Sequence, residues 1–164
     1  MVVIGVDPAF RRGGFWAAFL DTQERTVQFR SFRDVLTFDR FLFSPDAPHW
    51  AIGAVENSNK QNQNFDMSGN RPEVARKGRN VGTNQAVSEL TVRSMVDRYG
   101  AESVMNVSPR EKGKKYNEFY FYAALKGDGV RPIGYTGSQD QRDAYKLAHM
   151  ALSQFRMRRA MKNR

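Results

Sequence analysis

The chain has no cysteine, and its only histidines are His49 and His149. The absence of thiols excludes disulfide scaffolds, thiolate zinc sites and cysteine nucleophiles. With two imidazoles, a histidine-rich metal site or a Ser-His-Asp triad is not expected. No stretch approaches the ~20 apolar residues of a membrane span, and Asp7 and Pro8 break the apolar N-terminal run, so it is no signal-peptide core. We therefore expect a soluble, intracellular protein.

The composition is that of a folded, basic protein. A length of 164 residues suits one domain with a real core. Hydrophobic residues make up 40% of the chain and aromatic residues 12%, which excludes a disordered protein. Lys and Arg number 26 against 17 Asp and Glu, which gives a formal charge of +9. This charge implies an anionic partner, and nucleic acid is the commonest one.

Apolar periodicity predicts a single α/β domain with a five-stranded mixed sheet flanked by helices. The expected strands cover residues 2–7, 15–20, 26–32, 50–55 and 103–107. The expected helices cover residues 34–43, 85–99 and 117–126, with a last one from about residue 138. Residues 57–80 are rich in Asn, Gln, Gly and Ser and lack apolar periodicity, which predicts a long functional loop before an N-cap at Thr83.

Four acidic residues occupy positions where carboxylates are costly to bury. Asp7 and Glu56 end apolar segments, and ligand sites of open α/β sheets gather at the carboxyl ends of strands. Asp140 and Asp143 lie three residues apart on a predicted helix, so both project from one face and repel each other. A divalent cation such as Mg²⁺ is the expected positive partner. Taken singly, Asp7 could be a turn former, and the Asp140 and Asp143 pair could lie on a solvated helix face.

Taken together, these motifs have a specific resemblance. The order is Ile4-Gly5-Val6-Asp7-Pro8 followed by Gly14, then Ala54-Val55-Glu56, then Asp140-Gln141-Arg142-Asp143-Ala144. This set resembles the RuvC-type Holliday junction resolvases (crossover junction endodeoxyribonucleases) of the RNase H-like superfamily, over essentially the whole chain. Ala9 stands where that family usually has Gly, and residues 61–79 are unusually polar, as in a divergent member, for example one of phage origin.

The resemblance implies an RNase H-like fold and a function. The catalytic and metal-binding residues would be Asp7, Glu56, Asp140 and Asp143. They would hold two Mg²⁺ ions, which Mn²⁺ can replace, roughly 3.5–4 Å apart to activate water and stabilise the leaving 3′-oxygen. The implied activity is paired cleavage of four-way DNA junctions by a homodimer, in the cytoplasm of a bacterial or phage-infected cell.

The expected DNA contacts are basic residues and one aromatic residue. Residues 57–80 are the predicted DNA-contacting loop, which in the resembled family carries a side chain that wedges into the junction. Phe65 is the first candidate for this wedge and Met67 the second, although Phe65 could instead anchor the loop. For the basic tail, residues 156–164, we expect non-specific affinity. The predicted nucleic-acid-binding residues are Lys60, Phe65, Arg71, Arg76, Lys77, Arg79, Lys112, Lys114 and Lys115.

Other functions remain open from the sequence. The closest rival is an RNase H-like nuclease with another substrate, such as an RNA–DNA hybrid, a flap or structured RNA. A non-catalytic DNA-binding protein explains the charge but not the four carboxylates. An actin-like ATPase would need a second lobe for which the length leaves no room. The apolar helix over residues 85–99 is either part of the dimer interface or buried in its own core.

Overall fold

The sheet of this protein has six strands in the order β5-β4-β1-β2-β3-β6. The computed structural model describes residues 1–8, 15–57 and 69–162. The strands are β1 (Val2–Asp7), β2 (Phe15–Asp21), β3 (Thr26–Phe32), β4 (Ala51–Glu56), β5 (Val104–Val107) and β6 (Arg131–Ile133). The helices are α1 (Val35–Leu42), α2 (Arg71–Tyr99), α3 (Pro109–Lys112), α4 (Glu118–Asp128) and α5 (Gln139–Lys162), with a 3₁₀ turn, η2, at Ala101–Ser103. The predicted α/β class and mixed sheet are confirmed.

The strand directions bring the ends of β1 and β4 side by side. β1, β2 and β3 form an antiparallel meander, whereas β4 runs parallel to β1, β5 parallel to β4, and β6 parallel to β3. Val6 of β1 pairs with Val55 of β4. The next residues, Asp7 and Glu56, are therefore the last residues of two neighbouring strands and lie at the same end of the sheet. This register places two of the predicted site residues beside each other.

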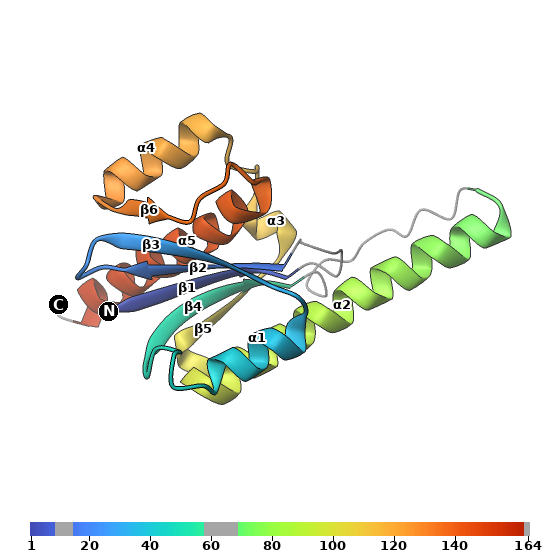
Figure 1. Ribbon diagram of the computed structural model, residues 1–164, viewed down its shortest axis with the longest axis horizontal. Helices are drawn as coiled ribbons and strands as arrows, with labels where there is room; N and C mark the ends of the chain where they lie inside the picture. The colour runs from blue at the N-terminus through green and yellow to red at the C-terminus, as the bar shows by residue number, and fades with distance from the viewer. Residues whose placement is uncertain (9–14, 58–68, 163–164) are drawn as a thin grey trace.

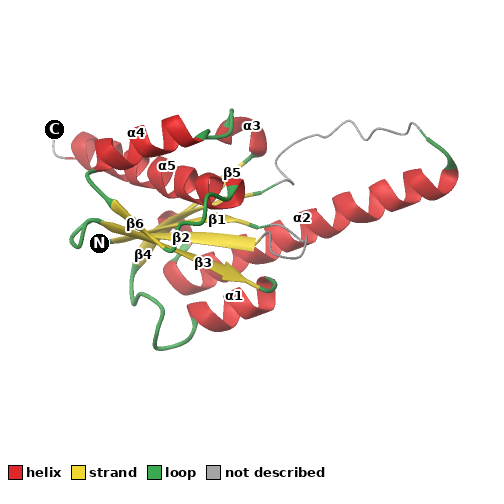
Figure 2. Ribbon diagram, turned by 45° about the horizontal axis from the view of Figure 1, so that its top comes forward, coloured by secondary structure: helices red, strands yellow, loops and turns green. Residues whose placement is uncertain are grey.

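Helices cover both faces of the sheet (Figure 2). α5 packs across β1, β2 and β4 on one face, and α4 lies outside it on the same side. α1 and the C-terminal part of α2 cover the other face, where Ile4, Val6 and Val55 meet Phe38 and Met95. Because consecutive strand residues point to opposite faces, β1 and β4 are buried on both sides and read as continuous apolar runs.

The close approach of α5 to β1 depends on a glycine. A Cβ on Gly5 would overlap the carbonyl oxygen of Ala144 and the amide nitrogen of Ala148 on α5. Both helix residues are alanines that are fully buried, so small residues on each side let the two backbones touch. This contact fixes the height of α5 over the sheet.

Replacing Gly5 with Ala is expected to lower the free energy of unfolding by about 3 kcal/mol, because a methyl group in a packed core forces backbone shifts. Urea unfolding followed by circular dichroism measures the change. The matched control is Gly127→Ala on α4, where a Cβ meets nothing within 4 Å. This variant should gain up to about 1 kcal/mol from helix propensity. Equal loss in both variants would contradict the close contact between β1 and α5.

The long helix α2 begins much earlier than the sequence pattern predicts. Asn70 is its N-cap: the Asn70 side chain accepts a hydrogen bond from the Glu73 backbone N–H, and the Glu73 carboxylate accepts one from the Asn70 backbone N–H, which completes a capping box. Pro72 lies in the first turn, where proline is tolerated. The predicted loop over residues 57–80 is therefore wrong from Arg71 onward, and Thr83 is no N-cap. The predicted helix end before Gly100, whose φ is 89°, is correct.

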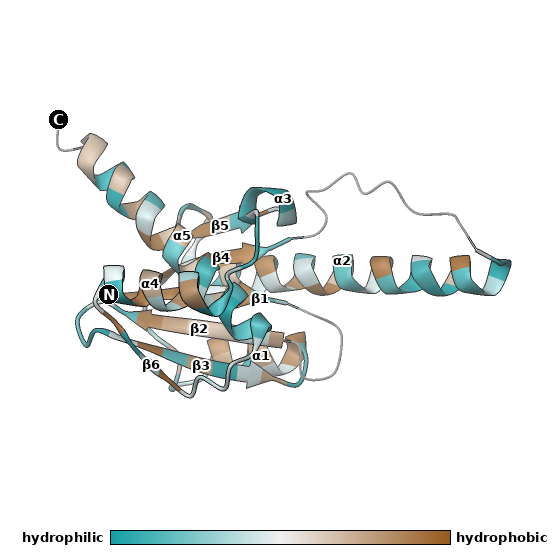
Figure 3. Cartoon of the chain, turned by 90° about the horizontal axis from the view of Figure 1, so that it is seen from above, coloured by the Kyte–Doolittle hydropathy of each residue, from teal (hydrophilic) through white to brown (hydrophobic). Residues whose placement is uncertain are grey.

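Only the C-terminal part of α2 packs against the domain. Its buried residues are Ser88, Thr91, Ser94, Met95 and Tyr99. The N-terminal half projects away from the sheet as an arm (Figures 1 and 3). Apolar periodicity is weak in this half because it has no core to face. The core role of the 85–99 segment is thus confirmed for its buried face, while Leu90 is exposed.

The sixth strand is the second correction to the predicted fold. The predicted sheet has five strands, but Arg131–Ile133 adds to β3 in parallel register. This strand is three residues long and contains Pro132, so it carries too little β-pattern to be recognised. None of the helices in the described part of the chain combines the length and apolar composition that crossing a bilayer needs.

Candidate functional site

All four predicted carboxylates line one pocket. Asp7, Glu56, Asp140 and Asp143 surround a hollow of about 300 Å³ at the end of the sheet where β1 and β4 finish. The remaining lining residues are Asn84 of α2, Lys112 of α3 and Lys115. Five segments of the chain thus contribute polar side chains to one place.

Strand alternation explains why Asp7 and Glu56 point the same way. On β1, Val3 belongs to the α5 side of the core, as do Ile52 and Ala54 on β4. Asp7 has the parity of Val3, and Glu56 has the parity of Ile52 and Ala54, so both carboxylates face α5. The register of the two parallel strands then makes them neighbours.

The apolar stripe of α5 explains the other two carboxylates. The residues of α5 that pack on the sheet are Ala144, Leu147, Ala148, Ala151 and Leu152. Asp140 and Asp143 lie four residues before Ala144 and Leu147, so they continue the same face by one turn beyond the core. Asp143 is buried, with 2% of its side chain exposed.

A lysine provides the positive charge between the carboxylates. The side chain of Lys112 is 6% exposed and makes an ion pair with Glu56 Oε2, and its Nζ lies 3.3 Å from Asp143 Oδ2. Ser108 begins α3 with a capping box to Glu111, which fixes the short helix that presents Lys112. The sequence predicts a divalent cation as the positive partner, and the chain supplies part of that charge itself.

The single positive charge of Lys112 does not balance the carboxylates around it. Burial raises the pKa of Asp7 to about 8, against the lowering effect of Lys112 and with the help of Glu56, Asp143 and Asp140. Burial alone would lower the pKa of Lys112, but Asp7, Glu56 and Asp143 outweigh it and hold the pKa above its usual value. At neutral pH, Asp7 therefore keeps its proton unless a cation replaces it.

Hydrogen bonds to Gln139 and Lys112 orient Asp143. Gln139 Nε2 donates to Asp143 Oδ1 at 2.8 Å and to the carbonyl oxygen of Tyr116 at 3.1 Å. Lys112 Nζ donates to the other carboxylate oxygen, Oδ2. Both oxygens of Asp143 thus have a donor, and the segment before α4 is tied to the start of α5. Gln139 gives no signal in the sequence, because an amide before an acidic pair is an ordinary helix start.

The donor set of the pocket fits a hard divalent cation. Carboxylate oxygens are the ligands that Mg²⁺ prefers, and Asp7 carries a proton that a metal would displace. Over residues 1–8, 15–57 and 69–162, however, no three acidic or histidine side chains are already arranged as a metal site. With the ammonium of Lys112 against Glu56 and Asp143, binding of a cation would require these side chains to rearrange.

The structure divides the predicted DNA contacts into two groups. Lys112 and Lys115 line the carboxylate pocket, and Lys115 Nζ lies 4.0 Å from Asp143 Oδ2 while most of its side chain is exposed, as is that of neighbouring Lys114. The other group lies on the projecting half of α2, away from the pocket, and comprises exposed Arg71, Arg76 and Arg79 and half-buried Lys77. Lys60, Phe65 and Met67 lie outside the described residues.

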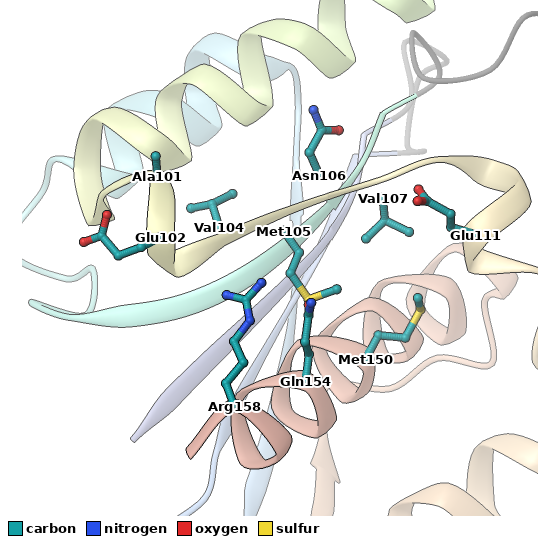
Figure 4. Close-up of a pocket in the computed structure, with 10 residues that line it drawn as sticks. All are labelled: Ala101, Glu102, Val104, Met105, Asn106, Val107, Glu111, Met150, Gln154 and Arg158. Atoms are coloured by element: carbon teal, nitrogen blue, oxygen red, sulfur yellow. The ribbon is translucent and has the colours of Figure 1, made fainter. Parts of the chain in front are cut away.

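A larger hollow exists elsewhere, between the edge strand β5 and α5 (Figure 4). Its volume is about 410 Å³, and Met105, Met150, Gln154 and Arg158 are among the residues that line it. None of the four carboxylates belongs to it. We place the candidate site in the smaller pocket because titratable groups with a perturbed pKa gather there.

Three pocket residues, Asn84, Lys112 and Lys115, were not predicted to line the site with the carboxylates. Asn84 follows the expected N-cap in the sequence, and only the longer course of α2 brings it to the pocket. Lys112 is predicted as a DNA contact, but its partners Glu56 and Asp143 become visible only in the fold. Neither a scan of protein-family models nor a search of curated protein sequences finds a match to this chain.

Proposed function

We propose that this protein is a metal-dependent endonuclease with an RNase H-like fold that cuts four-way DNA junctions. The observation that carries the proposal is the convergence of Asp7, Glu56, Asp140 and Asp143 on one pocket at the carboxyl ends of two parallel strands. Ligand sites of open α/β sheets gather at such ends. The formal charge of +9 supports a nucleic-acid substrate, and the junction itself is inferred from the resemblance of the motifs.

The four carboxylates, Lys112 and Gln139 each have a role in this proposal. The four carboxylates bind Mg²⁺, with Mn²⁺ as a substitute, and orient the attacking water and the scissile phosphate. When bound, such ions supply an activated water and neutralise charge that develops on the phosphate. Lys112 balances Glu56 and Asp143 before the metal binds, and Gln139 keeps Asp143 oriented by its hydrogen bond to Oδ1.

DNA binding is assigned to two basic surfaces. Lys115 lines the pocket and Lys114 precedes it in the chain, and both would contact the phosphates next to the scissile one. Arg71, Arg76, Lys77 and Arg79 on the α2 arm would contact a more distant part of the same DNA, since the helix rises ~1.5 Å per residue. The proposal includes a homodimer, because two symmetric cuts in a junction need two pockets. The exposed Leu90 on α2 is available for that contact.

The test is a side-by-side cleavage assay on a four-way junction, a flap, a linear duplex and an RNA–DNA hybrid. The junction is expected to be cut in Mg²⁺ and in Mn²⁺, and EDTA should abolish the reaction. Sedimentation of the purified protein with and without junction measures the expected dimer.

Three other outcomes of this assay would each contradict one part of the proposal. Cleavage of the hybrid or flap without the junction would keep the metal chemistry and replace the substrate. Tight junction binding without cleavage of any substrate, in either metal, would leave a DNA-binding protein that is not a nuclease. Cleavage that persists in EDTA would contradict the metal dependence.

A further inference from the structure

Three aromatic side chains are exposed in the first half of α4. Phe119 is 75% exposed, Tyr120 59% and Tyr122 52%, whereas Phe121 between them is fully buried. We call Phe119, Tyr120 and Tyr122 the aromatic platform. Single exposed apolar residues are normal, but three within four positions form a patch of the kind that marks an interaction site.

Two rings of the platform contact each other, and the third packs against neighbouring rings. The centroids of Phe119 and Tyr120 are 5.6 Å apart at an interplanar angle of 75°. Tyr122 packs against the buried ring of Phe121 at 5.3 Å and against Tyr135 at 6.1 Å. Tyr122 is therefore anchored, and its exposed remainder stands on a rigid base. Rigid aromatic faces bind a flat partner with little loss of conformational entropy.

The start of α4 is fixed to the carboxylate pocket. Tyr116, just before the N-cap of α4, accepts hydrogen bonds through its carbonyl oxygen from Gln139 Nε2 and Arg142 Nε, both at 3.1 Å. Gln139 also holds Asp143, and Arg142 lies 3.6 Å from Glu118 in the first turn of α4. Figure 1 shows α4 starting beside α3, at the pocket end of the sheet, and running back over α5.

The charges around the platform suit a polyanion. Exposed Lys114 and Lys115 precede α4 in the chain, with Lys115 lining the pocket, and exposed Lys126 shares the helix face of Phe119 and Tyr122. The acidic side chains of α4 are engaged elsewhere: Glu118 with Arg142, and Asp128 with Tyr145 and His149. Aromatic rings among lysines are the pattern that binds single-stranded nucleic acid by stacking on bases and pairing with phosphates.

We propose that the aromatic platform stacks unpaired bases of the DNA strand whose backbone enters the carboxylate pocket. This rests on the proposed nuclease function and deepens it, because it specifies a substrate with splayed or single-stranded nucleotides beside the cleavage point. Stacking needs only a base face, so the platform binds without sequence preference. Lys114 and Lys115 hold the phosphates between the stacked bases and the site.

The test measures binding without cleavage, in EDTA, by fluorescence anisotropy of a labelled oligo(dT) and of a duplex of equal length. Phe119→Ala with Tyr120→Ala should weaken oligo(dT) binding about tenfold or more, since stacking of each base contributes substantially, and change duplex binding less than twofold. Phe119→Trp should retain the affinity. The matched control is Leu36→Ala, because Leu36 is an exposed apolar residue on α1. This variant should change neither oligo(dT) binding nor duplex binding.

Direct stacking is read from 2-aminopurine placed in the single strand, whose fluorescence should be quenched by the wild-type protein and restored in the alanine variant. Unchanged oligo(dT) affinity, or an equal loss on duplex, would overturn the platform. A change in sedimentation instead would make this face a contact between two copies of the chain and also overturn it. If binding depends on Phe119 but the protein has no nuclease activity, the platform stands and the proposed nuclease function is refuted. If the protein cuts junctions but its binding does not depend on Phe119, the nuclease function stands and the platform is refuted.

Discussion

Replacing Asp143 with Asn is expected to lower the rate of junction cleavage about 10³-fold or more while DNA binding is retained. The exchange keeps the shape of a side chain that is 2% exposed, but it removes a negative charge from the proposed metal site. Metal ions contribute several kcal/mol of charge stabilisation in the transition state, and about 4 kcal/mol corresponds to this loss. Binding should be equal or tighter, because a charge that repels phosphate is removed. Single-turnover cleavage and anisotropy measure the two effects.

The control for Asp143→Asn is Asp97→Asn. Asp97 is exposed near the end of α2, where it pairs with Arg93 at 3.8 Å, and it does not line the pocket. The same chemical change there should leave cleavage and binding within about twofold of the wild type, as is usual for a surface ion pair. If Asp143→Asn cuts junctions at the wild-type rate, the assignment of the metal site is wrong.

Replacing Lys112 with Met is expected to destabilise the metal-free protein by about 3–5 kcal/mol, because it leaves buried carboxylates without their positive partner. Lys112 contacts both Glu56 and Asp143 and is itself buried. In EDTA the melting temperature should fall by about 10 °C for a chain of this size. Millimolar Mg²⁺ should restore part of this loss, since a cation that binds only the folded state stabilises it. Circular dichroism melts with EDTA and with Mg²⁺ give the comparison.

Lys126→Met is the control for this second variant, since Lys126 is an exposed lysine of α4 that does not line the pocket. Its melting temperature should match the wild type in both conditions. If Lys112→Met and the wild type have the same melting temperature in EDTA, the ammonium group of Lys112 is not the counter-ion of the buried carboxylates. Equal stabilisation of the wild type and of Lys112→Met by Mg²⁺ would mean that the metal does not replace Lys112.

The elements that follow from local sequence signals were predicted well. β1 and β4 are continuous apolar runs, and α1 repeats Val35, Phe38 and Leu42 at helical spacing. Such patterns are strong because the residues face a core on one side or both. The four carboxylates were singled out because they lie at strand and helix ends and because their order resembles that of the RuvC-type resolvases.

The errors fall where the apolar pattern carries no signal. The first turns of α2 have no core to face, so their polar sequence reads as a loop, although Asn70 and Glu73 form a capping box that starts the helix. The short β6 forms because β3 offers it an open edge, which its own three residues cannot indicate. In both places the deciding interaction is weak in the sequence or lies outside the segment.

The sequence by itself determined the α/β class and the four carboxylates, because strand alternation and helix periodicity assign each side chain a face before the chain is folded. It also determined the basic charge. Only the tertiary structure decided that Asp7, Glu56, Asp140 and Asp143 share one pocket, and that Lys112 lies buried among them. It also decided that the N-terminal half of α2 projects away from the sheet as a basic arm. These features depend on distances between segments far apart in the chain, which parity and periodicity do not contain.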